Sequence, residues 1–437
     1  MNLPQILSLI LLVVILVLAV WRHVNIGLLG FSAAAIIVMA TTAIADGSDT
    51  NTVLSSKDVL SHFPGAIVTL LIGVSLLFAH LEKSGGLSWF TDQIYAKMGH
   101  RTNIVPWIGY FIGFAISTAG AFSTASITLL VPVIAALGRK YPRLFFICEM
   151  AAIIGANTGA LSPINPTGQV ILDAAKKAHV EYSPWLVWFL GMLISFVLVI
   201  ALQIVFQDKR VVETNDAKAP EKGFVLLKPI KQENGDNHQL QPFYAICSTI
   251  AVLIFLILVI FAKANVGLTA LTLAVIMMLF FTQQSKDFVK KIPWNAVVVI
   301  SGLLVFIGTM MQVDTMKAVE QGLLSMTSSK IALLFMLAYL TTFLSNVESS
   351  TLGVISLMIP MVFTIFGDSP QISLILTACA APAMLSVVNP IHIAGTLVVS
   401  VTEEKQQEMM FKRLLIIAFA TVPFFPGLAM IVPALMM

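Results

Sequence analysis

Two stretches of this sequence place polar and helix-breaking residues in the middle of apolar runs. The first, Asn157 to Gly168, contains two asparagines, two prolines and three hydroxyl side chains, and the second, Ala381 to Pro390, ends in an Asn-Pro pair. Proline and glycine interrupt helical hydrogen bonding, so such stretches leave carbonyls and helix ends exposed inside an apolar segment. Carbonyls of this kind bind cations, and the positive N-termini of half-helices attract anions.

Two further apolar stretches, at about 103–138 and about 329–366, are also interrupted by polar residues, at Ser117–Thr124 and Ser345–Ser350. Four breaks rich in Ser, Thr and Asn predict one shared binding site. The alternative is that they are only kinks, satisfied by neighbouring helices. The residues predicted to contact a substrate are Ser123, Thr124, Asn157, Thr158, Asn165, Thr167, Ser345, Asn346, Ser350, Asn389 and His392.

The same breaks carry oxygen atoms that suit a coupling ion. The candidates are Ser123, Gly155, Asn157, Asn346, Glu348 and Ala381. An ionisable residue at membrane depth indicates function, and a bare Glu348 carboxylate would repel an anion. We therefore expect Glu348 to be protonated, to face a cation or to lie outside the site, with a cap or gate as the alternative role. His392 can meet a carboxylate or pack as a neutral histidine, and Glu149 is expected to be structural.

The composition shows which solvent surrounds these segments. The 437 residues are 58% hydrophobic and 11% charged, with a mean hydropathy of +0.94, whereas soluble domains carry about 25% charged residues. Lipid must therefore surround most of the chain. The net charge of +3 gives no reason to expect a nucleic-acid partner. The three cysteines have neither zinc-site nor disulfide spacing, so no metal site is expected.

Segments of about 20 apolar residues predict ten membrane crossings and an all-α polytopic protein. The crossings are expected near 4–22, 26–45, 63–81, 144–172 and 184–206, and near 242–262, 266–283, 294–312, 371–400 and 411–435. The stretches at 103–138 and 329–366 are predicted to be re-entrant hairpins, or else single long tilted helices. Residues 207–241 are polar and charged and are expected to form a cytoplasmic linker.

The two halves repeat one another. The matched segments are Leu161–Pro166 with Leu385–Pro390 (offset 224), Pro132 with Pro360 (228), Phe63–Gly73 with Ile292–Gly302 (229), and Val24–Leu28 with Ala264–Leu268 (240). Each half has five crossings and a hairpin that crosses nothing. Because five is odd, the second half must be inverted in the membrane. We therefore expect a first inverted repeat at 1–206 and a second at 242–437.

The distribution of Lys and Arg sets the orientation. With the N-terminus outside, 19 of the 25 Lys and Arg residues lie in cytoplasmic segments. Without the linker the ratio is still 13 to 6. Both termini are therefore expected to be extracytoplasmic, in the cell inner membrane. The first hairpin would enter from the cytoplasm and the second from outside.

Catalytic motifs are missing from the sequence. It contains no P-loop, no cluster of His and Cys at metal-ligand spacing and no Gly-x-Ser-x-Gly elbow. The chain is therefore expected to be neither an enzyme nor an ATP-driven pump, and to need no cofactor apart from a coupling ion such as sodium. A channel and a membrane-embedded enzyme are the alternatives outside secondary transport.

The two hairpins, two broken helices and the inverted copy resemble the ion transporter superfamily, which includes the divalent anion/sodium symporters and the arsenite carriers. Gly155–Pro163 and the Ser/Thr-rich first hairpin are most similar to the malonate/dicarboxylate carrier family, the MatC-like proteins. The resemblance implies a homodimer and an elevator mechanism. A scaffold of the first three and the sixth to eighth crossings would hold a moving domain of hairpins and broken helices.

The resemblance also implies the substrate class, a small di- or tricarboxylate moved with sodium or protons. The symporters carry Ser-Asn-Thr in each hairpin, whereas this chain has Phe122-Ser123-Thr124 and Ser350-Thr351-Leu352. Hydroxyl groups remain for a carboxylate, and the coupling ion stays open. The expected function is secondary transport of a dicarboxylate, malonate or a four-carbon acid. Arsenite, a monocarboxylate and a tricarboxylate are the alternatives.

Overall fold

The computed structural model describes residues 2–22, 24–45, 54–86, 104–140, 142–206, 241–327, 329–347, 351–385, 388–390, 392–402 and 404–436. Most of the linker at 207–241, together with Glu348 and Ser350, lies outside these ranges. The regular elements in the described part of the chain are helices.

The first half contains nine described helices. They are α1 (Leu3–Arg22), α2 (Ile26–Ala45), α3 (Ser56–Ser61), α4 (Gly65–Lys83), α6 (Val105–Thr118), α7 (Ser123–Lys140), α8 (Pro142–Gly159), α9 (Pro166–Lys177) and α10 (Pro184–Phe206). Both interrupted stretches predicted here are present. Residues 119–122 separate α6 from α7, and residues 160–165 separate α8 from α9.

The second half repeats this order. Its elements are α11 (Pro242–Ile260), α12 (Val266–Phe280), a 3-10 helix (Phe288–Lys291), α13 (Trp294–Gln312), α14 (Thr315–Met326), α15 (Lys330–Val347), α16 (Thr351–Phe366), α17 (Ile372–Leu385), α18 (Ile393–Val401) and α19 (Glu404–Met436). Polar residues end or begin several of these helices. Asn265, for example, caps α12 by accepting a hydrogen bond from the Leu268 N–H (3.0 Å).

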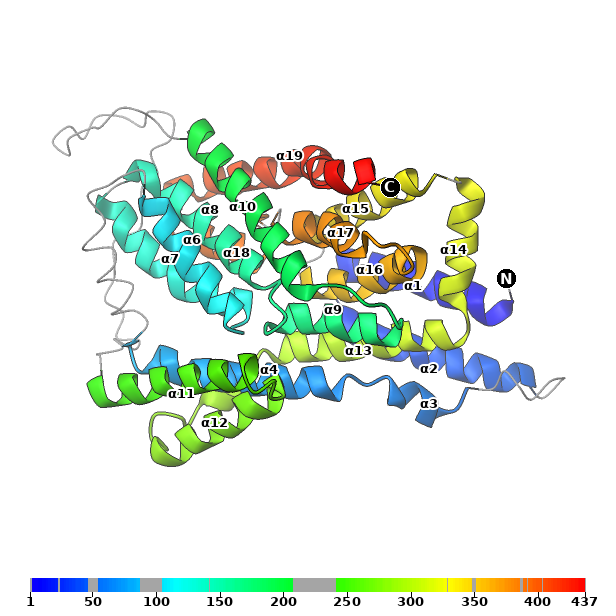
Figure 1. The fold of residues 1–437 in the computed structure, drawn as a ribbon, viewed down its shortest axis with the longest axis horizontal. Helices are drawn as coiled ribbons and strands as arrows, with labels where there is room; N and C mark the ends of the chain where they lie inside the picture. Colours follow the sequence, from blue (N-terminus) through cyan, green and yellow to red (C-terminus); the bar gives the residue numbers. More distant parts are fainter. Residues whose placement is uncertain are drawn as a thin grey trace.

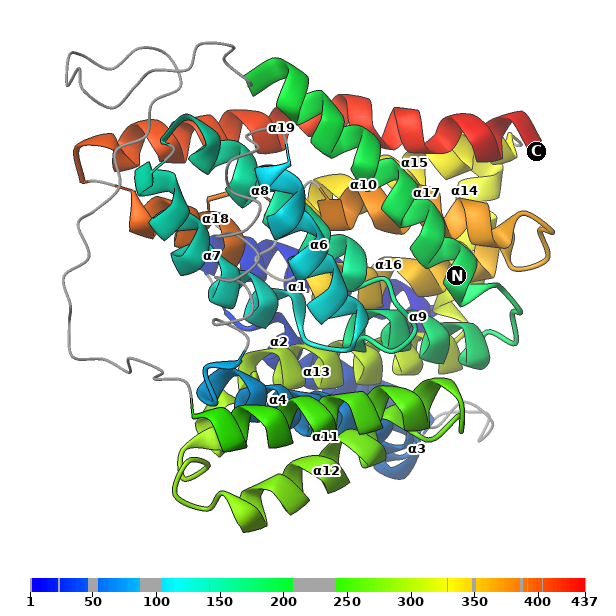
Figure 2. The ribbon, with the colours of Figure 1, turned by 60° about the vertical axis from the view of Figure 1, so that its left-hand side comes forward.

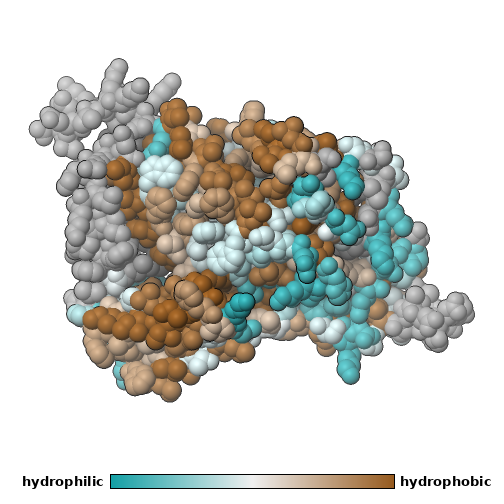
Figure 3. Space-filling model, in the orientation of Figure 1, coloured by the Kyte–Doolittle hydropathy of each residue, from teal (hydrophilic) through white to brown (hydrophobic). Residues whose placement is uncertain are grey.

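The chain is a polytopic membrane protein. In the described residues, six helices are long and apolar enough to cross a bilayer, and shorter apolar helices accompany them. Large apolar side chains also point outward, such as Phe243 (73% exposed) on α11 and Leu435 (83%) on α19. Figure 3 shows the resulting hydrophobic surfaces over α11 and α12 and over α10 and α19. A soluble fold would bury such continuous apolar faces, so lipid covers them.

The helices gather into two groups (Figures 1 and 2). One contains α2, α4, α11, α12 and α13, and the other contains α6 to α10 and α15 to α19. Within the first group, helices of one half pack against helices of the other half: α2 packs on α13, and α4 packs on α12. In the second group α6 packs on α8 and, correspondingly, α15 packs on α17.

Glycines allow α2 to pack closely on α13 and α4 to pack closely on α12. Where α2 meets α13, a Cβ on Gly302 would fall on the backbone of Gly27. Where α4 meets α12, a Cβ on Gly73 would fall on the carbonyl of Gly267. Small residues let membrane helices approach backbone to backbone. These four glycines belong to two of the sequence matches between the halves, so the repeated residues build the same crossing twice.

Some expectations differ from the structure in detail. The second break begins later than predicted, because α17 continues through Pro382 to Leu385. The first break is shorter than Asn157–Gly168, since α8 ends at Gly159 and α9 begins at Pro166. Helix α14 was not predicted, because its apolar face is too short to read as a crossing. Helix α19 begins before residue 411 and includes three prolines.

Candidate substrate site

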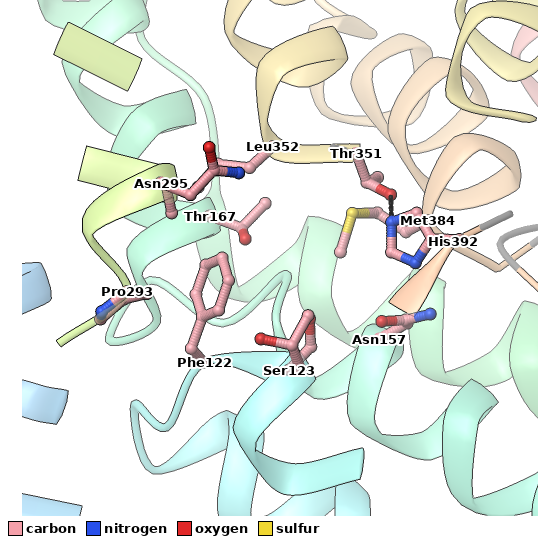
Figure 4. Close-up of a pocket in the computed structure, with 12 residues that line it drawn as sticks. Phe122, Ser123, Asn157, Thr167, Pro293, Asn295, Thr351, Leu352, Met384 and His392 are labelled. Carbon is pink, nitrogen blue, oxygen red and sulfur yellow. Dashed lines mark hydrogen bonds between the residues drawn. The ribbon is translucent and has the colours of Figure 1, made fainter. Parts of the chain in front are cut away.

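A cavity of about 120 Å³ lies where the two groups of helices meet (Figure 4). This volume is enough for several water molecules or one small organic acid. The residues lining it are Phe122, Ser123, Thr124, Asn157, Thr167, Pro293, Asn295, Ala296, Thr351, Leu352, Met384 and His392. Hydroxyl, amide and imidazole groups therefore face the space together with apolar side chains. That mixture is typical of a site for a small molecule.

Helix N-termini converge on this cavity. Ser123 begins α7, Thr351 begins α16 as described, and Thr167 is the second residue of α9. His392 is the N-cap of α18, and Pro293 is the N-cap of α13. The first turn of a helix has free N–H groups and carries a partial positive charge. Among the described residues, the starts of α7, α9, α13 and α18 lie at one cavity, which makes it a favourable place for an anion.

Two helix C-termini also reach the cavity. Asn157 lies two residues before the end of α8, and Met384 lies one residue before the end of α17. The last carbonyls of a helix lack partners within it and carry partial negative charge. The cavity thus joins two places that favour a cation to the N-termini that favour an anion, an arrangement that suits an anion moved together with a cation.

His392 is the titratable side chain among the described residues that line the cavity. It is 8% exposed, and its Nε2 lies 3.4 Å from the Thr351 hydroxyl oxygen. Its Nδ1 is buried and makes no hydrogen bond in the structure. A buried ring nitrogen without a partner is costly, so a ligand that bonds to it would be stabilised. The prediction that His392 lies at the site therefore agrees with its position.

The polar lining of the cavity repeats between the halves. Ser123 and Thr351 are 228 residues apart and each begins the helix that follows an interruption. Thr167 and His392 likewise occupy the starts of α9 and α18. Helix α9 packs against α16, and α18 packs against α7. At the cavity itself Thr351 of α16 and His392 of α18 lie side by side, whereas Ser123 and Thr167 supply hydroxyls from the first half.

Asn165 supports the site from behind. Its side-chain amide donates to the carbonyls of Ser117 and Ala121, at 2.8 Å each. Its amide oxygen accepts the Thr167 N–H at 3.0 Å and caps α9. These contacts join the α6–α7 turn to the start of α9. Asn165 does not line the cavity and instead fixes the positions of residues that do.

Asn389 has the same role in the second half. Its amide nitrogen donates to the Asn346 carbonyl at 2.6 Å. The Asn346 amide in turn donates to the Thr342 carbonyl at 3.0 Å, and the Ser345 hydroxyl donates to the Ala383 carbonyl at 2.7 Å. All three side chains are buried and lie outside the lining of the cavity.

The remaining predicted residues have varied positions. Thr158 donates to the Ile154 carbonyl within its own helix at 2.7 Å, so it does not face the cavity. Gly155 lies where α8 crosses α6, because a Cβ there would fall on the Tyr110 carbonyl. Ala381 is fully buried inside α17. The predictions for Glu348 and Ser350 fall outside the described residues.

Sequence reasoning missed the part of the cavity that α13 supplies. Pro293, Asn295 and Ala296 line it, and the Asn295 amide oxygen accepts a hydrogen bond of 2.5 Å from Asn25. It also missed Thr351, which lies beside the predicted Ser350. The repeated Pro64 and Pro293 motifs were a usable signal, because they mark corresponding helix starts in the two halves.

The fold and the cavity are those of a polytopic membrane protein with a small polar site between two groups of helices. In the described residues, no group of His, Cys, Asp and Glu is placed to hold a metal ion. The chain belongs to the CitMHS citrate transporter family, whose model matches residues 13–381. The prediction at superfamily level is thereby confirmed, whereas the narrower assignment to malonate/dicarboxylate carriers stays a prediction.

Other comparisons bear on the fold. The chain is similar to the YdaH transporter of Alcanivorax borkumensis, with a TM-score of 0.55 and 13% sequence identity. The similarity covers 98% of this chain and 97% of that one. At this identity it shows a shared fold. A search of curated protein sequences found no match to this chain.

Proposed function

We propose that this protein is a secondary active transporter that carries a small dicarboxylate, malonate or a four-carbon acid, together with sodium or protons. The supporting observation is that the starts of α7, α9, α13 and α18 lie at one cavity with His392. The cavity contains no Lys or Arg among its described lining residues. The anion is therefore held by N–H groups, hydroxyls and the imidazole.

The polar groups that the two halves contribute to the cavity favour a substrate with two carboxylates. Thr351 and His392 would bind one carboxylate, and Ser123 and Thr167 the other. Phe122, Leu352 and Met384 supply an apolar lining that suits a short carbon chain. A monocarboxylate would leave one of these two polar pairs without a partner, which disfavours its binding.

Citrate is the second candidate substrate. The family model that matches the chain describes a citrate transporter. Asn295 also lines the cavity and would accept or donate hydrogen bonds to a third carboxylate or a hydroxyl. The number of carboxylates bound would then depend on Asn295.

The way the cavity is divided supports an elevator mechanism. Most of its lining comes from the group of α7, α8, α9, α16 and α17, and one wall comes from the start of α13. The counterparts of Pro293, Asn295 and Ala296 in the first half are Pro64, Ala66 and Ile67, at an offset of 229. In the opposite state the moving group would close the cavity against the start of α4.

A second cavity marks the place where that contact would form. Ala66 and Ile67 line a space of about 100 Å³ with Gln169, Asp173 and Asn265. By the predicted orientation, the start of α4 faces outside and the start of α13 faces the cytoplasm. The structure would then correspond to the cytoplasm-facing state.

Counterflow in proteoliposomes tests the proposed function. Vesicles preloaded with unlabelled succinate, malonate or citrate are diluted into the same labelled acid without an ion gradient. A carrier accumulates label transiently, and we expect this for a dicarboxylate. A channel gives equilibration without an overshoot. Absence of counterflow for all three acids would overturn the proposed substrate class.

A further inference from the structure

Glu149 is a buried carboxyl group that the proposed substrate site does not use. It lies in α8, is 0% exposed, and neither of its carboxyl oxygens makes a hydrogen bond in the structure. Its neighbours on the helix, Cys148 and Met150, are equally buried. Asn157, which lines the cavity, lies eight residues further along α8, or about 12 Å along the helix axis.

The helices packed on α8 offer Glu149 no partner of opposite charge in the described part of the chain. They are α6, α7, α10 and α17. Their described titratable side chains are Tyr110, which bonds to Ser195 at 2.6 Å, and the buried Cys379. Arg139 and Lys140 end α7, next to the start of α8.

One cation approaches from α19. The Arg413 guanidinium carbon lies 4.0 Å from the centre of the Phe146 ring, which is one helical turn before Glu149. By the predicted orientation this side of α8 faces the cytoplasm. Arg413 thus contacts α8 at Phe146, on the side of Glu149 that leads to the cytoplasmic start of the helix.

An ionised carboxylate in such a place is strongly unfavourable, because the side chain is fully buried and meets no hydrogen-bond donor in the described part of the chain. In the described conformation Glu149 must therefore carry a proton. A structural role would not require an acid here, since a fully apolar side chain would fill the same space without this cost. Ionisable residues retained at membrane depth commonly serve proton transfer.

Resting on the proposed function, we propose that Glu149 is the proton-coupling residue of this transporter. A proton binds one carboxyl oxygen and makes the side chain neutral, which permits the described conformation. When the protein leaves this conformation, the proton is released toward the cytoplasmic start of α8, the end of the helix that Arg413 contacts at Phe146. Each transport cycle then moves one proton through Glu149 together with the substrate.

The variant Glu149→Gln tests this, because glutamine has the shape of the protonated acid and cannot titrate. The measurements use proteoliposomes and a labelled dicarboxylate that shows counterflow with the unmodified protein. A gradient of about one pH unit should drive roughly tenfold accumulation per coupled proton. We expect Glu149→Gln to retain counterflow and to lose both this accumulation and substrate-dependent proton movement, recorded with a trapped pH dye.

The matched control is Glu408→Gln. Glu408 is exposed, forms a 2.6 Å ion pair with Lys412, and should leave all three readouts unchanged when it is replaced. If Glu149→Gln fails to fold, Glu149→Asp replaces it and should shift the pH dependence of uptake.

The outcomes separate this proposal from the proposed function. Proton-driven accumulation by Glu149→Gln, or an unchanged pH profile in Glu149→Asp, would overturn the role of Glu149. Counterflow by the unmodified protein without any proton movement would do the same and leave the transport function standing. If the unmodified protein showed no counterflow of any carboxylate, the proposed function itself would fail.

Discussion

His392 both lines the cavity and begins helix α18 as its N-cap residue. It lies beside the Thr351 hydroxyl and has a second ring nitrogen that is buried without a hydrogen-bond partner (Figure 4). A carboxylate that accepts a hydrogen bond from this ring would gain roughly 2 kcal/mol, since bonds to charged groups are among the stronger ones.

Replacing this side chain should therefore weaken substrate binding. We expect His392→Asn to raise the KM for the transported dicarboxylate by roughly 30-fold, which corresponds to about 2 kcal/mol. The measurement is the concentration dependence of uptake. His179→Asn is the control, because His179 is exposed and is not among the residues that line the cavity. An unchanged KM in His392→Asn would remove His392 from the site.

Asn165 should behave differently, as a structural residue. In Asn165→Asp the side chain can no longer donate to the Ser117 and Ala121 carbonyls, so the Ala121 carbonyl loses its partner while the Ser117 carbonyl keeps the Gly120 N–H. We expect a loss of about 2–3 kcal/mol of stability. Thermal unfolding in detergent measures this.

The control for this prediction is Asn2→Asp, since Asn2 is exposed and a carboxylate keeps its acceptor role toward the Gln5 N–H. If Asn165→Asp kept its stability and lost only substrate affinity, Asn165 would belong in the cavity, contrary to the structure.

The sequence predicts which polar residues occur at the helix breaks, but not whether their side chains point into the cavity or toward the backbone. Ser123, Thr124, Asn157, Thr167 and His392 do line the cavity. Asn165 and Asn389 looked equally suitable, because an amide in a break can bind either a ligand or a backbone. Only the folded positions of the hairpin carbonyls decide between the two, and these contacts span 43 to 48 residues in sequence.

At the scale of helices, glycines at the α2–α13 and α4–α12 contacts allow the two halves to pack together. Helices α2 and α13 touch backbone to backbone at Gly27 and Gly302, and a methyl group has no room there. We expect Gly302→Ala to destabilise the protein by about 1–3 kcal/mol, as overpacking does. Thermal unfolding in detergent again provides the readout.

Gly322→Ala is a control of the opposite sign. Gly322 lies in α14 and has open space where its Cβ would go. Replacing an exposed helical glycine by alanine should stabilise by up to about 1 kcal/mol. Equal effects of the two substitutions would show that the α2–α13 crossing is looser than described.

Helix positions were the most predictable part of the fold. Apolar length alone placed α2, α10 and α13 at their ends, because a membrane span has a fixed length and polar or proline residues delimit it. The end of α17 was harder. Pro382 lies inside the helix, since neighbouring helices tolerate a proline that would end a helix in water.

On the scale of the whole molecule, the repeat predicts that the moving helices contact the start of α13 in the described state and the start of α4 in the opposite state. Ala296 and Leu352 share the cavity now, and their counterparts in the other half are Ile67 and Thr124. In a background without Cys148, Cys247 and Cys379, the pair Ile67→Cys and Thr124→Cys should become linked by a short bifunctional thiol reagent during turnover.

Formation of that link should stop transport, and the pair Ala296→Cys with Leu352→Cys should stop it from the opposite state. Both links are read by mass spectrometry of the intact protein and by uptake. A protein that remains fully active while the Ile67–Thr124 pair never reacts would contradict the elevator mechanism.

The arrangement of the cavity between the two groups of helices could not be predicted in the same way. Nothing in the local sequence of Pro293 or Asn295 indicates a binding residue, and their place at the site depends on how α13 packs against the moving helices. Long-range packing of this kind leaves only a weak trace in sequence, here the repeat of the Pro64 and Pro293 motifs.

The most direct test of the central claim is a map of the protein in lipid nanodiscs, by electron cryo-microscopy, with and without the dicarboxylate that shows counterflow. The account predicts added density between Ser123, Thr351 and His392, with the two carboxylates at the starts of the helices. Density instead in the second cavity, beside Gln169 and Asp173, or no added density at saturating substrate, would contradict it.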